Sequence, residues 1–386
     1  MSTVIAIISE YNPFHNGHEY QIKMVREMFD DCIVVSIMSG NVVQRGEFAL
    51  FDKYSRAKAA VKCGVDVVFE LPFPFSSSNA EKFATTGVKI ASLIGADYLC
   101  FGTENYSLEE LKKLADVIDS EEYESALSDE LKNKEQSFIR AKEAALSKLG
   151  FSIPYESNSI LGVEYIRALN KYAKEVTPLC INRVGSEYDG EKDNLYLPAH
   201  KIRETFYREN VLKCIPDNVK NVFEKDISDG KFLDEKKSKQ FLYQSVLIKE
   251  PELIDSSYDT PVGCGTFIKK LALDSNNSDD FFAGLSSKSY TTSRLKRTII
   301  YSVFNIRSID TDISFLILLG ANKRGCDYLN DIKGISIISN TRNVKELSKE
   351  EQLLYKKNRE VDSLYYSFLG KPNMPSKVYK NNPYIE

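Results

Sequence analysis

The N-terminal stretch constrains this chain more than any other. Residues 4–8 form an apolar, strand-like run, and residues 12–17 bring together Asn, Pro and Gly, which favour a turn. A helical pattern starts at His18, because apolar Ile22 and Val25 recur on one side. A strand, a tight turn and a helix in this order place ligands at the carboxyl end of the strand and at the helix N-terminus.

Two of the protein's three histidines lie at this junction, in an H-x-G-H pattern formed by residues 15–18. A neutral imidazole donates a hydrogen bond to a phosphate oxygen, and a protonated one adds charge. Beside free backbone N–H groups, His15 and His18 can hold a triphosphate and stabilise a leaving pyrophosphate. Gly17 is expected to let the backbone approach the nucleotide. The alternative is a pair of surface histidines in a loop, which the position after a strand disfavours.

Strand-like and helical segments alternate through residues 3–101, which predicts an α/β fold with a doubly wound parallel sheet. The ligand crevice should lie above the carboxyl ends of the strands. Residues 107–148 predict two solvated helices. The elements expected before them are strands over 32–38, 66–71 and 98–101 and helices over 52–63 and 79–93.

The pattern changes at about residue 215, beyond which helical segments dominate. We therefore predict two domains, residues 1–214 and a mainly helical C-terminal domain of residues 215–386. Within the second, residues 315–319 form only a short apolar run.

Composition narrows the class of protein. The net charge of −4 argues against a general nucleic-acid binder but leaves room for a local basic face. No apolar run approaches the length of a membrane span, so no membrane partner is expected. The seven cysteines are scattered without a C-x-x-C pair. They predict reduced thiols in a cytoplasmic protein, with no disulfide partner and no metal site.

Longer strings carry a resemblance to a known family. The string E-Y-N-P-F-H-N-G-H at residues 10–18 resembles that of the bacterial tRNA(Met) cytidine acetate ligases, which belong to the HxGH nucleotidylyltransferase superfamily. The resemblance covers roughly the first 205 residues closely and the rest loosely. It implies a Rossmann-like, ATP-binding catalytic domain followed by a tRNA-binding domain. Further matching strings lie at residues 40–47, 64–72, 101–104 and 157–162.

The resemblance implies an ATP-dependent ligase that forms a C–N bond. Acetate would be activated as acetyl-adenylate, and N4 of the wobble cytidine (C34) of elongator tRNA(Met) would be acetylated to N4-acetylcytidine. ATP would be the co-substrate, and Mg²⁺ is expected with it, although no sequence feature fixes a metal ligand. Two other classes stay open: a nucleotidylyltransferase acting on a small phosphorylated substrate, and a non-catalytic RNA-binding protein with the same fold.

The resemblance also implies roles for particular residues. His15 and His18 would be catalytic. The implied ATP-binding residues are Ile7, Ile8, Ser9, Glu10, Tyr11, Asn12, Pro13, Phe14, His15, Asn16, Gly17, His18, Glu19, Tyr20, Gly102, Asn158 and Arg183.

A basic stretch over residues 288–297 carries four positive charges and no acid. Lys and Arg can take phosphates there, and an interleaved Tyr can stack on a base. The alternative is a solvated helix N-terminus. The tRNA-binding residues expected in this stretch are Lys288, Tyr290, Arg294, Lys296 and Arg297.

Other polar residues have plain structural interpretations. Lys53 and Arg56 stand at i, i+3, a spacing typical of an ordinary solvated helix face. Arg45 can bind an anionic substrate, or it can be an exposed loop residue. Asn158 is expected to cap the helix over residues 160–172, which is compatible with a nucleotide contact.

One segment departs from the superfamily pattern. Pro198 and His200 stand where hydroxyl residues are usual before an Ile-Arg pair, here residues 202–203. His200 and Lys201 can still contact phosphate, but with a different geometry.

Overall fold

A mostly parallel β-sheet forms the centre of the molecule. The computed structural model describes residues 2–133, 138–154, 156–183, 195–206, 211–287, 290–310, 312–370 and 382–386. Within these residues the sheet has eight strands in the order β10-β8-β5-β2-β1-β6-β7, with β9 beside β8. The strands are β1 (Thr3–Ser9), β2 (Cys32–Ser39), β5 (Val67–Leu71), β6 (Tyr98–Thr103), β7 (Thr177–Asn182), β8 (Phe315–Ala321), β9 (Ser336–Ile338) and β10 (Tyr384–Ile385).

The central strands explain why the N-terminal half could be predicted. Every residue of β2 is buried, as expected of a strand covered on both faces. β1 runs parallel to β2, with Thr3 opposite Cys32 and Ser9 opposite Met38. The doubly wound α/β prediction is confirmed.

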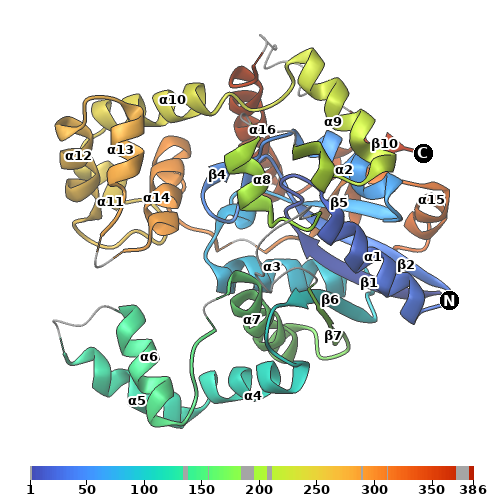
Figure 1. The fold of residues 1–386 in the computed structure, drawn as a ribbon, viewed down its shortest axis with the longest axis horizontal. Coiled ribbons are helices and arrows are strands. Elements are labelled where there is room, and N and C mark those ends of the chain that lie inside the picture. The colour runs from blue at the N-terminus through green and yellow to red at the C-terminus, as the bar shows by residue number, and fades with distance from the viewer. Residues whose placement is uncertain are drawn as a thin grey trace.

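Helices cover both faces of this sheet (Figure 1). Right-handed crossovers place α1 (Asn16–Met28) and α2 (Lys53–Lys62) on one face and α3 (Ala80–Leu93) and α7 (Ser157–Tyr172) on the other. A Cβ at Gly87 of α3 would lie 2.5 Å from Ile8 Cδ1, so this glycine lets α3 approach β1 closely. Strand order reverses between β1 and β6, which makes the carboxyl ends of these two strands the expected ligand crevice.

Three helices, not two, follow β6. They are α4 (Leu108–Ile118), α5 (Glu121–Leu131) and α6 (Phe138–Lys148). The prediction of two helices over residues 107–148 was therefore wrong. The reason is local: the Ser120 hydroxyl accepts from the backbone N–H of Tyr123 and starts α5 just after α4 ends.

The C-terminal half is mainly helical, as predicted, and α10 to α14 form a lobe beside the sheet (Figure 1). A two-stranded hairpin of β3 (Val42–Val43) and β4 (Glu47–Phe48) lies between the sheet and α14. The helices of this half are α8 (Ala199–Thr205), α9 (Asp217–Asp229), α10 (Glu235–Ile248), α11 (Pro251–Asp255), α12 (Cys264–Asp274), α13 (Ser278–Gly284), α14 (Thr292–Phe304), α15 (Lys323–Leu329) and α16 (Lys349–Ser367). The short 3-10 turns are η1 (Phe75–Ser77), η2 (Val211–Cys214) and η3 (Asn343–Glu346).

The sheet does not end at the boundary predicted near residue 215. β8 pairs antiparallel with β5, with Val67 opposite Ala321, and β10 pairs with β8. One continuous hydrophobic core runs from Val4 to Leu369. The division into residues 1–214 and 215–386 stays a prediction, but hydrogen bonds and core packing cross it.

Two further observations concern membrane-spanning helices and disulfide bonds. None of the described helices is both long and apolar enough to cross a membrane. All seven cysteines are free thiols.

Candidate active site

The bend between β1 and α1 forms the centre of the site. Tyr11 turns the chain with a φ of 47°, a left-handed conformation that is uncommon for a residue with a side chain. The side-chain oxygen of Asn12 accepts from the backbone N–H of Leu50 at 2.8 Å. Tyr11 and Phe14 are buried and pack edge to face. The protein's own contacts therefore hold the shape of the bend.

The two histidines of the bend cap α1 reciprocally. His15 is the N-cap, and its Nδ1 accepts from the backbone N–H of Gly17 at 3.0 Å. The Nδ1 of His18 accepts from the backbone N–H of His15 at 3.2 Å. The two rings stack with centroids 3.7 Å apart. A Cβ at Gly17 would lie 2.9 Å from His15 Cε1, so this glycine makes room for the imidazole itself.

These contacts fix the protonation state of both rings. Because each Nδ1 accepts a hydrogen bond, the proton of each neutral imidazole is on Nε2. Burial, and after it the positive charges of Arg183 and Arg203, lowers the pKa of His15 to about 3. Burial, followed by His15 and Arg183, holds the pKa of His18 well below its usual value. At neutral pH the bend therefore presents two neutral N–H donors rather than imidazolium ions.

The opposite wall of the crevice comes from β6 and β7. Gly102 pairs with Ile181, and the backbone N–H of Arg183 donates to the carbonyl of Thr103 at 3.0 Å. A Cβ at Gly102 would lie 3.1 Å from Cγ of Arg183. The aliphatic part of Arg183 thus lies over Gly102, a predicted ATP-binding residue, and the charge of Arg183 acts on both histidines.

The start of α7 joins two of the strings noted in the sequence. Asn158 donates through its amide to Glu104, and the Ser159 hydroxyl donates to the other carboxylate oxygen of Glu104 at 2.9 Å. The N-cap position is Glu156, so the prediction that Asn158 caps this helix was wrong. Its side chain instead fixes the segment after β6 against α7.

Several remaining predicted ATP-binding residues make structural contacts. Ile7 is buried in the core, and the Ser9 and Ser36 hydroxyls lie 2.9 Å apart. A Glu10 carboxylate oxygen accepts from the backbone N–H of Gln44 at 2.8 Å, which joins the bend to the β3–β4 hairpin.

The first turns of α1 face the segment before α8. The amide of Asn16 donates to the carbonyl of Leu195 at 2.8 Å, and the rings of Tyr20 and Tyr196 meet edge to face. Glu19 instead forms an i, i+4 ion pair with a lysine of α1 at 3.0 Å.

Helix α8 adds a residue that the sequence interpretation did not assign to the site. Arg203 donates to the carbonyl of Asn12 at 2.7 Å and lies 3.8 Å from a carboxylate oxygen of Glu47. The sequence feature that could have identified Arg203 is the Ile-Arg pair at residues 202–203, which ends the segment that departs from the superfamily pattern. Burial lowers the pKa of His200, and Arg45 and Arg203 contribute in the same direction against the pull of a neighbouring carboxylate. Positive charge therefore converges on the bend.

A buried arginine supports the bend from below. Arg56 is fully buried and donates to four carbonyls, at 2.5–3.0 Å. The prediction that Arg56 and Lys53 share a solvated face was wrong, because both side chains point into the protein. The four carbonyls are those of Glu10, Ser39, Gly40 and Phe51.

Lys53 lies in a buried ionic network. Its ammonium contacts Glu70 at 2.7 Å and Asp362 of α16 at 2.6 Å, and the three side chains are at most 1% exposed. Asn358 donates to Glu70 at 3.0 Å, and Asn41 donates to Asp362 at 2.8 Å. Partners from the two ends of the chain thus meet beneath the loop that follows β2.

The basic stretch expected to bind tRNA packs against the β3–β4 hairpin. Lys296 contacts Glu47 at 2.5 Å, and Arg294 contacts Asp259 at 2.7 Å. Arg297 is 7% exposed and donates to the carbonyl of Gln44 at 3.3 Å.

Of the other two residues predicted to bind tRNA, the structure describes only Tyr290. Tyr290 is half-buried against the core, and Lys288 lies outside the described residues. A tRNA-binding role for the stretch stays a prediction.

Comparison with known proteins identifies the family. A model of the HIGH Nucleotidyl Transferase family matches residues 1–381. A protein of Caldicellulosiruptor bescii named tRNA(Met) cytidine acetate ligase is 32% identical over 342 residues, covering 86% of this chain and 85% of the relative. This chain belongs to the tRNA(Met) cytidine acetate ligase family. Membership confirms the resemblance and the prediction of a ligase that forms a C–N bond.

Other members of this ligase family match to the same extent. The ligase of Fusobacterium nucleatum is 31% identical over 380 residues, covering 94% of this chain and 95% of the relative. Crystal structures of Thermotoga maritima TmcAL, one apo and one bound with alpha-thio ATP, superpose with TM-scores of 0.90 and 0.89. Both are 26% identical and cover 99% of each chain.

Proposed function

We propose that the protein uses ATP to activate acetate as acetyl-adenylate and then acetylates N4 of the wobble cytidine, C34, of elongator tRNA(Met). The observation that carries the proposal is the pair of stacked, neutral imidazoles at the start of α1, with Arg183 and Arg203 beside them. The names of the relatives support acetate and tRNA(Met) as substrates. The Thermotoga maritima structure bound with alpha-thio ATP supports ATP as the nucleotide.

In the first step a carboxylate oxygen of acetate attacks the α-phosphorus of ATP. The bond between the α-phosphorus and its bridging oxygen to the β-phosphate breaks, so that pyrophosphate leaves and acetyl-adenylate forms. Negative charge builds on the bridging oxygen and the β-phosphate. The Nε2–H groups of His15 and His18 can donate to these oxygens, and the arginines supply the positive charge that neutral imidazoles lack.

In the second step the N4 amino group of cytidine attacks the acetyl carbonyl carbon. A C–N bond forms, the acyl–phosphate C–O bond breaks, AMP leaves, and the amine loses a proton. Because acyl-adenylates react with water, the bend must exclude water until the RNA arrives.

The residues around the bend indicate how the expected Mg²⁺ would be bound. Among the described residues no group of three or more His, Cys, Asp or Glu side chains could hold a metal ion. The bend brings together two imidazoles and the guanidinium groups of Arg183 and Arg203, which suit phosphate better than a cation, and the carboxylate of Glu10 is hydrogen-bonded to Gln44. Mg²⁺ bound to the phosphate oxygens of ATP would add charge neutralisation, as is usual for this ion.

Acetate-dependent exchange of labelled pyrophosphate into ATP tests the first step without tRNA. His18→Ala should reduce exchange about 100-fold, because it removes one preorganised donor. His18→Gln, which can keep a donor near the Nε2 position, should retain more activity than His18→Ala. Undiminished exchange by the alanine variant would remove the histidine from the chemistry.

Mass analysis of tRNA nucleosides tests the second step. Cells that lack the protein should lose N4-acetylcytidine from elongator tRNA(Met). Retention of the modified nucleoside would overturn the assignment of substrate and product.

A tRNA-binding measurement across salt concentrations tests the basic stretch over residues 288–297. If several of its cations contact phosphates, the logarithm of the affinity should fall linearly with the logarithm of salt concentration. Replacing Arg294 with Gln should make that slope shallower by about one. An unchanged slope would place the RNA elsewhere.

A further inference from the structure

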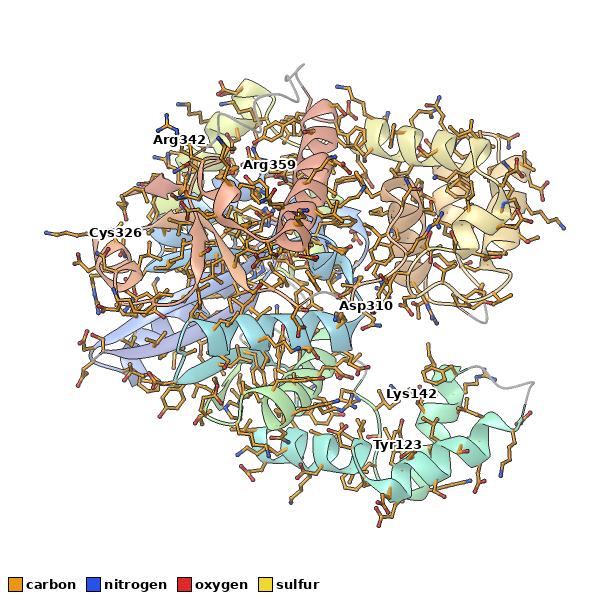
Figure 2. The ribbon with its side chains drawn as sticks, turned by 180° about the vertical axis from the view of Figure 1, so that it is seen from behind. Tyr123, Lys142, Asp310, Cys326, Arg342 and Arg359 are labelled. Carbon is orange, nitrogen blue, oxygen red and sulfur yellow. The ribbon has the colours of Figure 1, made fainter. Side chains whose placement is uncertain are left out.

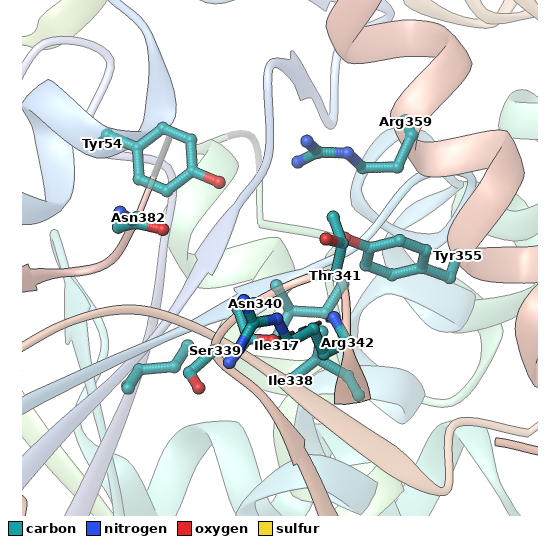
Figure 3. A pocket seen from close by; sticks show the side chains of 11 residues that line it. Tyr54, Ile317, Ile338, Ser339, Asn340, Thr341, Arg342, Tyr355, Arg359 and Asn382 are labelled. Carbon is teal, nitrogen blue, oxygen red and sulfur yellow. Dashed lines mark hydrogen bonds between the residues drawn. The ribbon is translucent and has the colours of Figure 1, made fainter. Parts of the chain in front are cut away.

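A second site, separate from the bend, lies between α2, the sheet edge and α16. It is a pocket of about 350 Å³, which is within the range of small-molecule sites. Figure 2 shows Arg342 and Arg359 near one another on the far side of the molecule, and Figure 3 shows the pocket from close by. Its lining includes Tyr54, Ser339, Asn340, Arg342, Tyr355 and Arg359.

The charge of this pocket is positive. Arg342 and Arg359 come from different elements and both line it, and none of its described lining residues is acidic. Arg359 lies 3.6 Å from Asp362, but that carboxylate is shared with Lys53 at 2.6 Å. The buried network therefore neutralises itself and leaves Arg342, which is exposed, as added positive charge. Guanidinium groups at such a place suit a phosphate, which they can bind in bidentate fashion.

The rest of the lining suits a planar ring. Tyr54 and Tyr355 lie on opposite sides of the pocket, and Ile317 and Ile338 contribute aliphatic surface (Figure 3). Side chains of the loop after β9 offer hydroxyl and amide groups. Within that loop Asn340 accepts from the backbone N–H of Arg342 at 2.9 Å, so its amide nitrogen is not used in that contact. Aromatic faces beside arginines are the usual surroundings of a stacked nucleobase and its phosphate.

A chain of buried contacts connects this pocket to the bend. Arg359 contacts Asp362, and Asp362 accepts from the amide of Asn41. The neighbouring carbonyl of Gly40 accepts from Arg56 at 2.5 Å, and Arg56 also donates to the carbonyl of Glu10 at 2.6 Å. An occupied pocket would therefore touch the same framework that holds the catalytic bend.

We propose that this pocket binds one nucleoside monophosphate unit, with its phosphate on Arg342, beside the guanidinium group of Arg359, and its base against Tyr54 and Tyr355. The unit is either a free mononucleotide or one nucleotide of an RNA chain. The RNA source rests on the proposed function, whereas the pocket itself does not. Failure of pyrophosphate exchange would not affect the pocket, and an empty pocket would not affect exchange.

Calorimetric titration with cytidine 5′-monophosphate tests the free source. The full chain is used, with a non-hydrolysable ATP analogue saturating the nucleotide site at the bend. We expect one binding site that Arg342→Glu weakens about tenfold or more, because a charge-assisted contact is replaced by repulsion. The matched control is Lys345→Glu, the same change of charge at an exposed residue of η3 outside the lining, and it should bind as the wild type does. Cytidine binding as tightly as its monophosphate would overturn the phosphate assignment.

Binding of tRNA across salt concentrations tests the RNA source. Arg342→Glu should weaken binding about tenfold and make the salt slope shallower by about one, whereas Lys345→Glu should do neither. Asn340→Asp keeps the oxygen that accepts from Arg342 and adds a negative charge, so it replaces Arg342→Glu if that variant does not fold. If the monophosphate does not bind and the two glutamate variants hold tRNA equally well, the proposal is wrong.

Discussion

The two imidazoles of the bend can act only through Nε2, because each has already used its Nδ1. His15 accepts from Gly17, and His18 accepts from His15, so that the two side chains proposed as catalytic donors also form the cap of α1. Under the proposed function, a substitution at either position should change helix capping and catalysis together. Loss of activity in a variant therefore has to be separated from loss of stability.

The low pKa of His15 predicts a pH-dependent stability. Below about pH 6.5 the unfolded chain binds a proton at this residue and the folded chain does not, so stability falls as the pH falls toward the folded pKa of about 3. The loss should be about 1.4 kcal/mol per pH unit. In His15→Asn, which can still cap the helix, this part of the slope should disappear. Urea unfolding of both proteins from about pH 6.5 to about pH 4.5 measures the difference, and parallel curves would refute the assignment.

The positions of His15, His18 and Gly17 could be predicted because their contacts are local, within three residues of one another. Their charge state could not, since it depends on Arg183 and Arg203, which are distant in the sequence. The same limit explains the errors at Lys53 and Arg56. A lysine and an arginine one turn apart normally face water. The sequence around Lys53 does not indicate that its partner is Asp362, more than 300 residues later.

At the scale of elements, the β3–β4 hairpin joins the bend after β1 to the helical lobe. Gly46 at its tip has a φ of +72°, and a Cβ there would lie 2.6 Å from the backbone nitrogen of Arg297. Next to it, Glu47 lies between Arg203 of α8 and Lys296 of α14. Burial opposes the ionisation of Glu47, but Lys296 and Arg203 hold its pKa below the usual value. The hairpin was not predicted, because two-residue strands leave little pattern in a sequence.

Gly46→Ala should therefore destabilise the protein more than its backbone conformation alone would require. Gly95 is the matched control, because its φ is +70° and a Cβ added there would meet nothing within 4 Å. Gly95→Ala should cost about 1 kcal/mol, and Gly46→Ala about 2 kcal/mol more, since α14 must move. Chemical denaturation measures both. Equal costs would mean that α14 is free to shift away from the hairpin.

Helix α2 buries charged side chains as well as an apolar face formed by Ala57, Ala59, Ala60 and Val61. Lys53→Met would leave Glu70 buried without a cation and Asp362 with only Arg359 at 3.6 Å, at a cost of about 3–5 kcal/mol. Because burial already raises the pKa of Glu70, that cost should shrink as the pH falls and the carboxylates take up protons.

The control on the same helix is Lys62→Met, whose partner Glu386 is 3.7 Å away at the surface. It should change stability by no more than about 0.5 kcal/mol. Urea unfolding at two pH values measures both variants. A small effect of Lys53→Met would show that the network is not needed.

For the whole molecule, the sheet is completed by residues from the far end of the chain. The alternation of strands and helices over residues 3–101 could be predicted, because each β-α-β unit is local. The pairing of β8 with β5 could not, since an apolar run over residues 315–319 does not reveal its neighbour. A fragment of residues 1–214 should therefore fail to unfold cooperatively, because it lacks β8, Asn358 and Asp362. Circular dichroism with urea measures this, and a cooperative transition would support the predicted domain boundary.

The meeting of β5 with β8 also has a consequence for protein synthesis. A ribosome that has made the first half of the chain has already produced the paired histidines, but the apolar edge of β5 still lacks its covering strand. The ammonium of Lys53 can pair with Glu70 at this stage, but its second carboxylate partner, Asp362, has not yet been made. A nascent chain therefore cannot complete the central sheet or the ionic network beneath the bend until residues 315–362 have been made.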